Sequence, residues 1–105
     1  MATCTVWVAE SDAPLGFIAF RTGWVDHLYV EVGHDRRGIG TALIGKAMAS
    51  NQVLQLWAFQ KNRAALGFYR RRGFLVVRET DGSDNEEREP DVLLAWQRDG
   101  QSVPA

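Results

Sequence analysis

The chain has 105 residues with 12 basic and 13 acidic side chains, which give a formal net charge of −1. That length fits one domain, residues 1–105, and a hydrophobic fraction of 46% excludes a largely disordered chain. The near-neutral charge argues against nucleic acid as a partner, and no apolar run approaches the roughly 20 residues that cross a bilayer, so no membrane partner is expected. The single cysteine, Cys4, cannot form an intrachain disulfide, which favours a reducing, cytoplasmic setting.

Three short strands are predicted at the start of the chain. Residues 3–10, 15–22 and 24–32 carry alternating or nearly continuous apolar side chains. Turn-forming residues at 11–14 separate the first two strands, and Gly33 ends the third. The short connections predict an antiparallel meander.

The apolar spacing then changes to that of helices. Residues 39–50 and 63–72 have apolar side chains at helical spacing, and Gly73 follows the second helix where a C-terminal cap glycine belongs. Between the helices, residues 53–59 are apolar on both faces, which is typical of a central, parallel strand after a crossover helix. Trp57 on this strand is interpreted as a core residue.

The last third of the chain completes the predicted sheet. Residues 74–80 and 92–98 predict two strands, joined by a polar loop over 81–91 that carries six acids and one arginine. A frayed tail is expected over 99–105. The order is therefore β-β-β-α-β-α-β-β, an α/β fold with a mixed central sheet.

A glycine-rich turn, Asp35-Arg36-Arg37-Gly38-Ile39-Gly40-Thr41, lies between a predicted strand and a predicted helix. Glycines one residue apart let a backbone approach a bulky ligand closely, and the helix start offers unpaired N–H groups. Arg36 and Arg37 add forked donors, so the segment fits a pyrophosphate cradle. A tight turn with two solvated arginines explains the same glycine spacing equally well.

Two other phosphate-binding motifs do not fit this segment. The dinucleotide-binding fingerprint needs a third glycine where Leu43 stands. A P-loop over residues 40–47 needs serine or threonine where Ala47 stands, and the stretch is better interpreted as an amphipathic helix.

With these residues the chain resembles the GNAT superfamily of N-acetyltransferases, as a short, N-terminally reduced member. The turn at 35–40 corresponds to the family's Q/R-x-x-G-x-G/A motif, which binds acetyl-CoA. A more specific family motif, N-x-x-A-x-x-F-Y-x-x-x-G-F, is matched without a gap by Asn62, Ala65, Phe68, Tyr69, Gly73 and Phe74. The resemblance covers about residues 3–98 and implies the GNAT fold without its usual N-terminal strand and two helices.

The resemblance implies an N-acetyltransferase that moves an acetyl group from acetyl-CoA, its co-substrate, directly to a primary amine. The cofactor-binding positions it implies are Leu28, Tyr29, Val30, Arg36, Arg37, Gly38, Ile39, Gly40, Thr41, Asn62, Ala65 and Tyr69. Backbone groups of residues 28–30 would bind the pantetheine arm and polarise the thioester carbonyl, and Asn62 would hydrogen-bond that arm.

Tyr69 would protonate the departing thiolate. Phenols have a pKa of about 10 and thiols about 8.5, so this transfer is closely balanced. The alternative for Tyr69 is an amphipathic core residue beside Phe68.

The general base is left open between residues of the third strand. Asp26, His27 and Glu31 are candidates; His27 has a suitable intrinsic pKa near 6.5, and Glu31 is close in sequence to the strand end. A packed or solvent-facing side chain is the plainer interpretation of His27. No grouping of His, Cys, Asp and Glu has metal-ligand spacing, so no metal is expected.

The chain departs from the family pattern at two places. Asp35 stands where the family usually has Gln or Arg. The reduced N-terminus implies exposed apolar faces that a homodimer would cover. The acidic loop at 81–91 attracts a cationic amine acceptor or is only a solvated hairpin connection. The rival function is an acyl-CoA-binding sensor or regulatory module without turnover. A nucleic-acid-binding domain built on the basic group of Lys61, Arg63 and Arg70 to Arg72 is a weaker third hypothesis.

Overall fold

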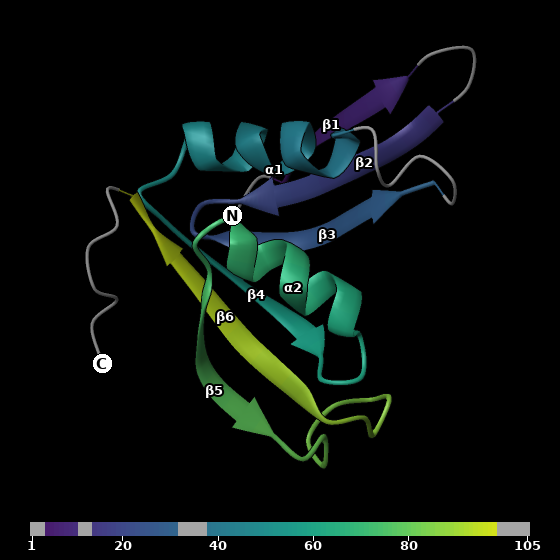
Figure 1. The fold of residues 1–105 in the computed structure, drawn as a ribbon, viewed down its shortest axis with the longest axis vertical. Helices are drawn as coiled ribbons and strands as arrows, with labels where there is room; N and C mark the ends of the chain where they lie inside the picture. The colour runs from purple at the N-terminus through teal and green to yellow at the C-terminus, as the bar shows by residue number, and fades with distance from the viewer. Residues whose placement is uncertain (1–3, 11–13, 32–37, 99–105) are drawn as a thin grey trace. The chain divides into compact units, whose positions relative to one another are not determined.

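A computed structural model describes residues 4–10, 14–31 and 38–98 of the chain. Its elements are β1 (Thr5–Glu10), β2 (Pro14–Arg21), β3 (Trp24–Val30), α1 (Ile39–Ala49), β4 (Val53–Phe59), α2 (Arg63–Arg71), β5 (Leu75–Thr80) and β6 (Asp91–Gln97) (Figure 1). The predicted α/β class and the order β-β-β-α-β-α-β-β are confirmed, with element ends at most two residues from those predicted. The chain divides into two compact units, Met1–Leu54 and Gln55–Ala105.

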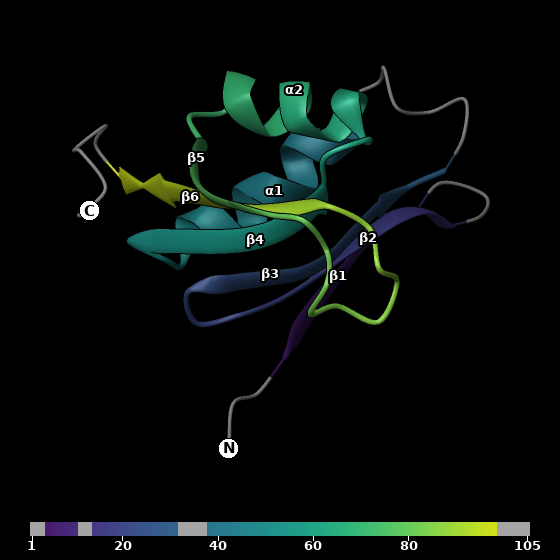
Figure 2. The same ribbon diagram turned by 90° about the horizontal axis from the view of Figure 1, so that it is seen from below.

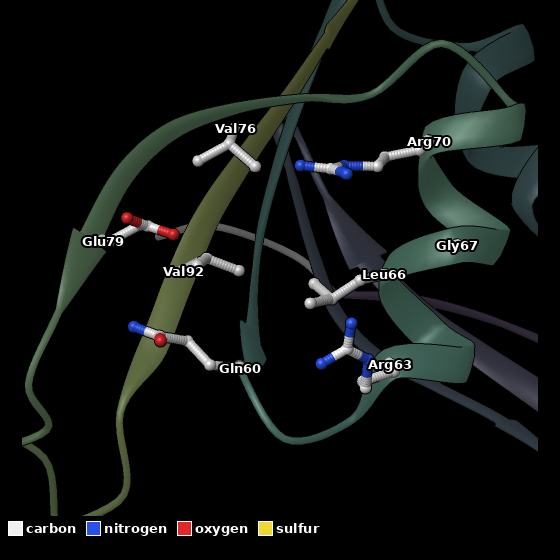
Figure 3. A pocket seen from close by; sticks show the side chains of 8 residues that line it. All are labelled: Gln60, Arg63, Leu66, Gly67, Arg70, Val76, Glu79 and Val92. Atoms are coloured by element: carbon white, nitrogen blue, oxygen red, sulfur yellow. The ribbon is translucent and has the colours of Figure 1, made fainter.

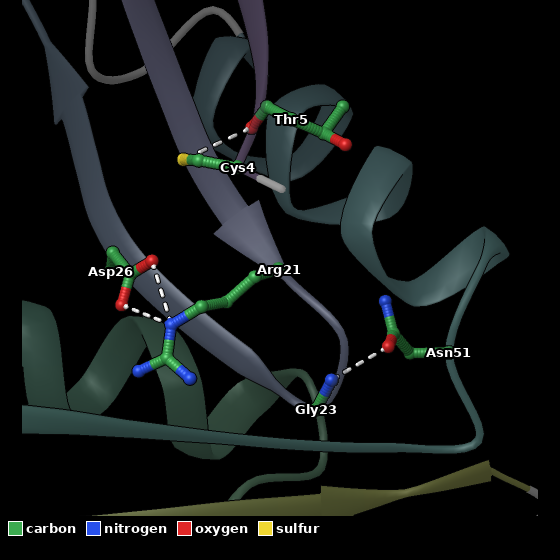
Figure 4. A network of polar contacts seen from close by, with 6 residues as sticks. All are labelled: Cys4, Thr5, Arg21, Gly23, Asp26 and Asn51. Atoms are coloured by element: carbon green, nitrogen blue, oxygen red, sulfur yellow. Dashed lines mark hydrogen bonds and ion pairs between the residues drawn. The ribbon is translucent and has the colours of Figure 1, made fainter. Parts of the chain in front are cut away.

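In the first unit, β1, β2 and β3 form the predicted antiparallel meander in that hydrogen-bonded order. Gly23 lies in the turn between β2 and β3 and has a φ of +80°. Its backbone N–H donates to Oδ1 of Asn51 at 2.9 Å (Figure 4). The β2–β3 register shifts between Ala19 and Phe20, which leaves Asp26 as the extra residue of a bulge. The bulge lets buried Val25 and half-buried Leu28 both face inward.

The bulge also turns the Asp26 side chain outward. Its carboxylate accepts a hydrogen bond from Nε of Arg21 at 3.2 Å (Figure 4). Because this ion pair is exposed, it contributes little to the free energy of folding.

Helix α1 covers one face of the meander (Figure 2). Leu43, Ile44 and Ala47 recur on one side of the helix and are buried, as are Ile18 and Phe20 on β2. On the outer rim, the Lys46 ammonium lies 4.4 Å from the centre of the Trp7 ring. The first unit therefore has one apolar layer between its helix and its strands.

In the second unit the hydrogen-bonded strand order is β4-β6-β5. β5 and β6 pair antiparallel, and β4 runs opposite to β6 (Figure 1). Helix α2 ends at Arg71, and Gly73, with a φ of +95°, follows the C-cap residue Arg72. The N–H of Gly73 donates to the Arg70 carbonyl at 3.0 Å, and that of Phe74 to the Tyr69 carbonyl at 3.1 Å. These two bonds define a Schellman motif, so the predicted cap glycine is confirmed.

The core of this unit is aromatic. The rings of Tyr69 and Phe74 are 5.4 Å apart and those of Phe74 and Trp96 are 6.4 Å apart, with Phe74 fully buried. Trp57, in contrast, is 45% exposed, so its interpretation as a core residue is wrong. β4 buries Leu56 but presents Trp57 outward, because successive side chains of a strand point to opposite faces.

Two negative findings hold for the described ranges. No helix there is long and apolar enough to cross a membrane. Within the same ranges, no group of three or more His, Cys, Asp and Glu side chains is arranged to hold a metal ion.

Candidate functional site

The predicted site residues belong to both units. The end of β3, with Leu28, Tyr29 and Val30, and the start of α1, from Gly38 to Thr41, lie in the first unit, where α1 packs against β3. Asn62, Ala65 and Tyr69 lie on α2 or at its start, in the second unit. Arg36 and Arg37 lie outside the described residues.

Close backbone approach shapes the end of β3. Gly16 on β2 is paired with Val30, and a Cβ atom at Gly16 would lie 2.5 Å from the carbonyl oxygen of Tyr29. Next to this pair, the N–H of Glu31 donates to the Leu15 carbonyl at 2.7 Å. Gly16 is not among the site residues predicted above; a glycine inside a predicted strand is the signal that points to such a contact.

The candidate bases share the face of β3 that α1 does not cover. After the bulge, His27, Tyr29 and Glu31 alternate onto this face, and all three are exposed. The Tyr29 hydroxyl donates to Oε2 of Glu31 at 3.1 Å, and this hydrogen bond raises the pKa of Tyr29. The Glu31 carboxylate thus lies directly after β3, the strand whose backbone is predicted to polarise the thioester carbonyl.

The start of α1 is suited to an anion. Gly38, the N-cap residue, has a left-handed conformation with φ 75°, and no described atom lies within 4 Å of a Cβ placed there. Glycine is therefore favoured by backbone conformation rather than by space. Among the described residues no side chain caps this helix, and its first turn has no acid, so the helix dipole favours a negatively charged group there.

Helix α2 starts at a side-chain cap. Oδ1 of Asn62 accepts a hydrogen bond from the N–H of Ala65 at 3.1 Å. Asparagine is favoured at this position because its oxygen satisfies an N–H that the helix leaves unpaired. With spacings of three and four residues, Asn62, Ala65 and Tyr69 lie on one side of the helix.

Burial changes the acidity of Tyr69. Its side chain is 8% exposed and contacts the rings of Phe68 and Phe74 edge-on, with centroids 5.3 and 5.4 Å away. Desolvation raises the pKa of Tyr69 to about 12. Relative to a thiol with a pKa of about 8.5, proton transfer from this phenol is uphill by roughly 3.5 pH units, so the near balance expected from unperturbed groups does not hold here. At neutral pH Tyr69 is a hydrogen-bond donor.

The acidic loop between β5 and β6 is held by its own hydrogen bonds. Asn85 donates to the Glu89 carbonyl at 2.8 Å and to Asp91 at 3.2 Å, and it accepts from the Glu89 N–H at 3.2 Å. Lys61 forms an ion pair with Glu89 at 3.2 Å. The N–H of Ser83 donates to Asp81, which lowers the pKa of that carboxyl.

Two hollows meet at Trp57 beside this loop. One of about 390 Å³ is lined by Trp57, Arg78, Thr80, Asp84, Asn85 and Asp91. The other, of about 230 Å³, is lined by Trp57, Ala58, Phe59, Glu87 and Asp91. The two linings together carry an aromatic ring, the three carboxylates of Asp84, Glu87 and Asp91 and one arginine, Arg78, and this excess of acids favours a cation.

Comparison with known sequences identifies relatives. The profile of the acetyltransferase (GNAT) domain matches residues 2–76. The chain is 32% identical to the peptidyl-lysine N-acetyltransferase YiaC of Escherichia coli K12 over 98 residues, which are 91% of this chain and 66% of YiaC. It is 29% identical to the peptidyl-lysine N-acetyltransferase YjaB of the same organism over 93 residues, which are 87% of this chain and 63% of YjaB. The chain therefore spans no more than about two thirds of the length of these relatives.

Solved structures show the same fold. The solution structure of apo YjaB from Escherichia coli superposes with a TM-score of 0.77 at 27% identity, over 87% of this chain and 63% of YjaB. A Bacillus anthracis protein crystallised with acetyl coenzyme A superposes with a TM-score of 0.80, over 91% of this chain and 63% of its own. At 17% identity, the second likeness concerns the fold alone.

Proposed function

Because the chain belongs to the GNAT family of acetyltransferases, we propose that it is an N-acetyltransferase that moves the acetyl group of acetyl-CoA directly to a primary amine. In this proposal residues 1–105 act as one domain, since the family profile extends over parts of both units. The free amine attacks the thioester carbonyl, whose developing negative charge is held by backbone N–H groups at the end of β3, and no covalent enzyme intermediate is needed.

The observation that carries the proposal is the arrangement of α2. Asn62, Ala65 and Tyr69 share one side of the helix, with a neutral, buried phenol one turn beyond Ala65. In the proposed reaction, Asn62 binds the pantetheine arm with the amide NH₂ that its capping bond does not use. Tyr69 donates its hydrogen bond to the sulfur as negative charge develops there, and the proton transfers as the C–S bond breaks.

The start of α1 supports the proposed pyrophosphate site. Gly38, Ile39, Gly40 and Thr41 begin a helix that has no described side-chain cap and no acid in its first turn. Arg36 and Arg37 precede this turn in the sequence and would add charge-assisted hydrogen bonds to the same phosphates.

Glu31 is the first candidate for the general base, and His27 stays the second. The Tyr29 hydroxyl orients the Glu31 carboxylate, whereas no hydrogen bond of that kind is seen for His27 in the described part of the chain. A base must be deprotonated to act, so its titration sets the acidic limb of the kcat/KM profile. We expect Glu31→Gln to remove this limb and His27→Gln to leave it in place; the opposite result would assign the base to His27.

A lysine side chain of a peptide is the proposed acceptor. YiaC and YjaB are named peptidyl-lysine N-acetyltransferases, and the hollows beside Trp57 combine an aromatic ring with the carboxylates of Asp84 and Glu87. With a lysine peptide, Asp84→Asn and Glu87→Gln are expected to raise KM without lowering kcat. Equal KM values for variant and wild type would contradict this part of the proposal.

The deciding experiment is thiol release from acetyl-CoA in the presence of a lysine peptide, with Tyr69→Phe as the test variant. Removing a proton donor is expected to lower kcat by about 100-fold while the affinity for CoA is retained. Phenylalanine keeps the ring contacts with Phe68 and Phe74, so the fold is retained. The rival hypothesis, an acyl-CoA sensor without turnover, predicts CoA binding with no thiol release from the wild type.

A homodimer and a cytoplasmic location complete the proposal. The dimer is supported by apolar side chains on the face of the meander away from α1, where Val6, Val8 and Phe17 are exposed. Sedimentation equilibrium should give a dimer for the wild type and a monomer for Val8→Lys. The cytoplasmic location rests on the single cysteine, Cys4, and fluorescence microscopy of a tagged chain tests it.

A further inference from the structure

A hollow of about 300 Å³ lies between α2 and the β5–β6 hairpin (Figure 3). Its lining consists of Gln60, Arg63, Leu66, Gly67, Arg70, Val76, Glu79 and Val92. The hollow lies entirely within the second unit.

This hollow uses a different side of α2 from the proposed cofactor residues. Its four helical residues, 63, 66, 67 and 70, follow the spacing of a single helical stripe. At 100° per residue, this stripe is centred about 120° around the helix from the side that carries Asn62, Ala65 and Tyr69. The hollow is therefore separate from the proposed thioester site.

Charges of both signs face the hollow from opposite walls. Arg63 and Arg70 project from α2, and the Glu79 carboxylate projects toward the hollow from β5 (Figure 3). None of these three side chains takes part in an ion pair within the described ranges. Their charges are therefore not neutralised by an ion pair among the described residues.

The rest of the lining is uncharged. Leu66 and Val76 supply an aliphatic surface, whereas Val92 is buried. Gly67 adds no side chain of its own, and the nearest described neighbour of a Cβ there is Nη1 of Arg71, 3.2 Å away. The Gln60 side chain is held in place because its amide donates to the carbonyls of Thr80 at 2.9 Å and Asp91 at 3.2 Å.

We propose that this hollow binds a small zwitterion with an aliphatic body. Arg63 and Arg70 pair with its carboxylate, Glu79 pairs with its ammonium group, and the aliphatic body lies on Leu66 and Val76. A ligand with only a negative charge would be repelled by Glu79, and one with only a positive charge by the two arginines. This site is independent of the proposed acetyl transfer.

The test is an NMR titration of the full chain with three probes of matched length: 6-aminohexanoate, hexanoate and hexylamine. We expect 6-aminohexanoate to shift the amide signals of α2 and β5 and to bind about fivefold more tightly than either singly charged probe, as befits one additional exposed ion pair. Saturating CoA should leave these shifts in place.

Matched variants assign the two charges. Arg70→Gln should remove the preference for 6-aminohexanoate over hexylamine. Glu79→Gln should remove the preference for 6-aminohexanoate over hexanoate. Arg78→Gln, a change of the same kind on β5 but in the lining of a different hollow, should alter neither. Gly67→Leu should fill the hollow and abolish binding of all three probes, and the two charge variants decide the question if Gly67→Leu does not fold.

Three results would overturn the proposal. Hexanoate binding as tightly as 6-aminohexanoate would leave only a nonselective anion site. If none of the three probes shifted the amide signals, the hollow would not bind a ligand of this kind. Shifts of the same signals by adenosine 3′,5′-bisphosphate, together with loss of 6-aminohexanoate binding when CoA is added, would make the hollow part of the cofactor site.

Discussion

Tyr69 is held in the neutral form by burial, and this makes the stability of the protein depend on pH. Its pKa is about 12 in the fold, against about 10 for an unfolded tyrosine. Between these values the unfolded chain binds fewer protons than the folded chain, so stability is intact below pH 10 and falls as pH rises toward 12. We predict that Tyr69 makes the wild type lose about 1.4 kcal/mol between pH 9 and pH 11, measured by urea unfolding.

Two variants isolate this contribution. Tyr69→Phe has no phenol to ionise and should lack this part of the loss. Tyr29→Phe removes the exposed phenol and should retain the Tyr69 contribution. If the free energy of unfolding fell with pH equally steeply in Tyr69→Phe and in the wild type, a buried, neutral Tyr69 would be contradicted.

Asn62 has two proposed uses that substitution can separate. Its Oδ1 caps α2, and its NH₂ is proposed to bind the pantetheine arm. Asn62→Ala removes both groups and should cost about 1 kcal/mol of stability as well as CoA affinity. Asn62→Asp keeps a capping oxygen and places a negative charge at a helix N-terminus, so it should retain stability while losing CoA affinity. Wild-type CoA affinity in Asn62→Asp would limit Asn62 to capping.

At the scale of elements, the packing of β2 against β3 depends on Gly16. A methyl group there would lie 2.5 Å from the Tyr29 carbonyl oxygen, which belongs to backbone and cannot rotate away. We predict that Gly16→Ala lowers the free energy of unfolding by about 1–3 kcal/mol, measured by thermal or urea unfolding, and weakens CoA binding because the end of β3 must shift.

Gly45 provides the matched control within the same unit. It lies inside α1, and no described atom is within 4 Å of a Cβ placed there. Since alanine favours helix over glycine, Gly45→Ala should raise stability by about 0.5–1 kcal/mol. If Gly16→Ala left the free energy of unfolding unchanged while Gly45→Ala raised it, the contact at Tyr29 would not constrain the packing of β2 against β3.

At the scale of the whole molecule, ligand binding should raise the melting temperature. Acetyl-CoA at 100 times its dissociation constant adds about 2.7 kcal/mol. For a domain of this size each kcal/mol corresponds to roughly 4–8 °C, so we predict a rise of about 10 °C or more in calorimetry. Acetate at the same concentration is the control. No rise at millimolar acetyl-CoA would contradict both the enzyme and the sensor hypotheses.

The sequence by itself determined the element order and the family. Helical and strand periodicities are local, so they predicted both helices and all six strands to within two residues. Gly73 was predictable as a cap because the helix stripe ends just before it, and the positive φ confirms it. The motif from Asn62 to Phe74 was equally local, and it carried the family resemblance that the GNAT profile confirms.

Tertiary structure decided what depends on residues distant in the sequence. An apolar pattern on both faces of β4 does not show which face is covered, so the 45% exposure of Trp57 could be known only from the fold. The need for Gly16 arises from its contact with a neighbouring strand. The raised pKa of Tyr69 arises from desolvation, which exists only once Phe74 and the surrounding core have assembled around the phenol.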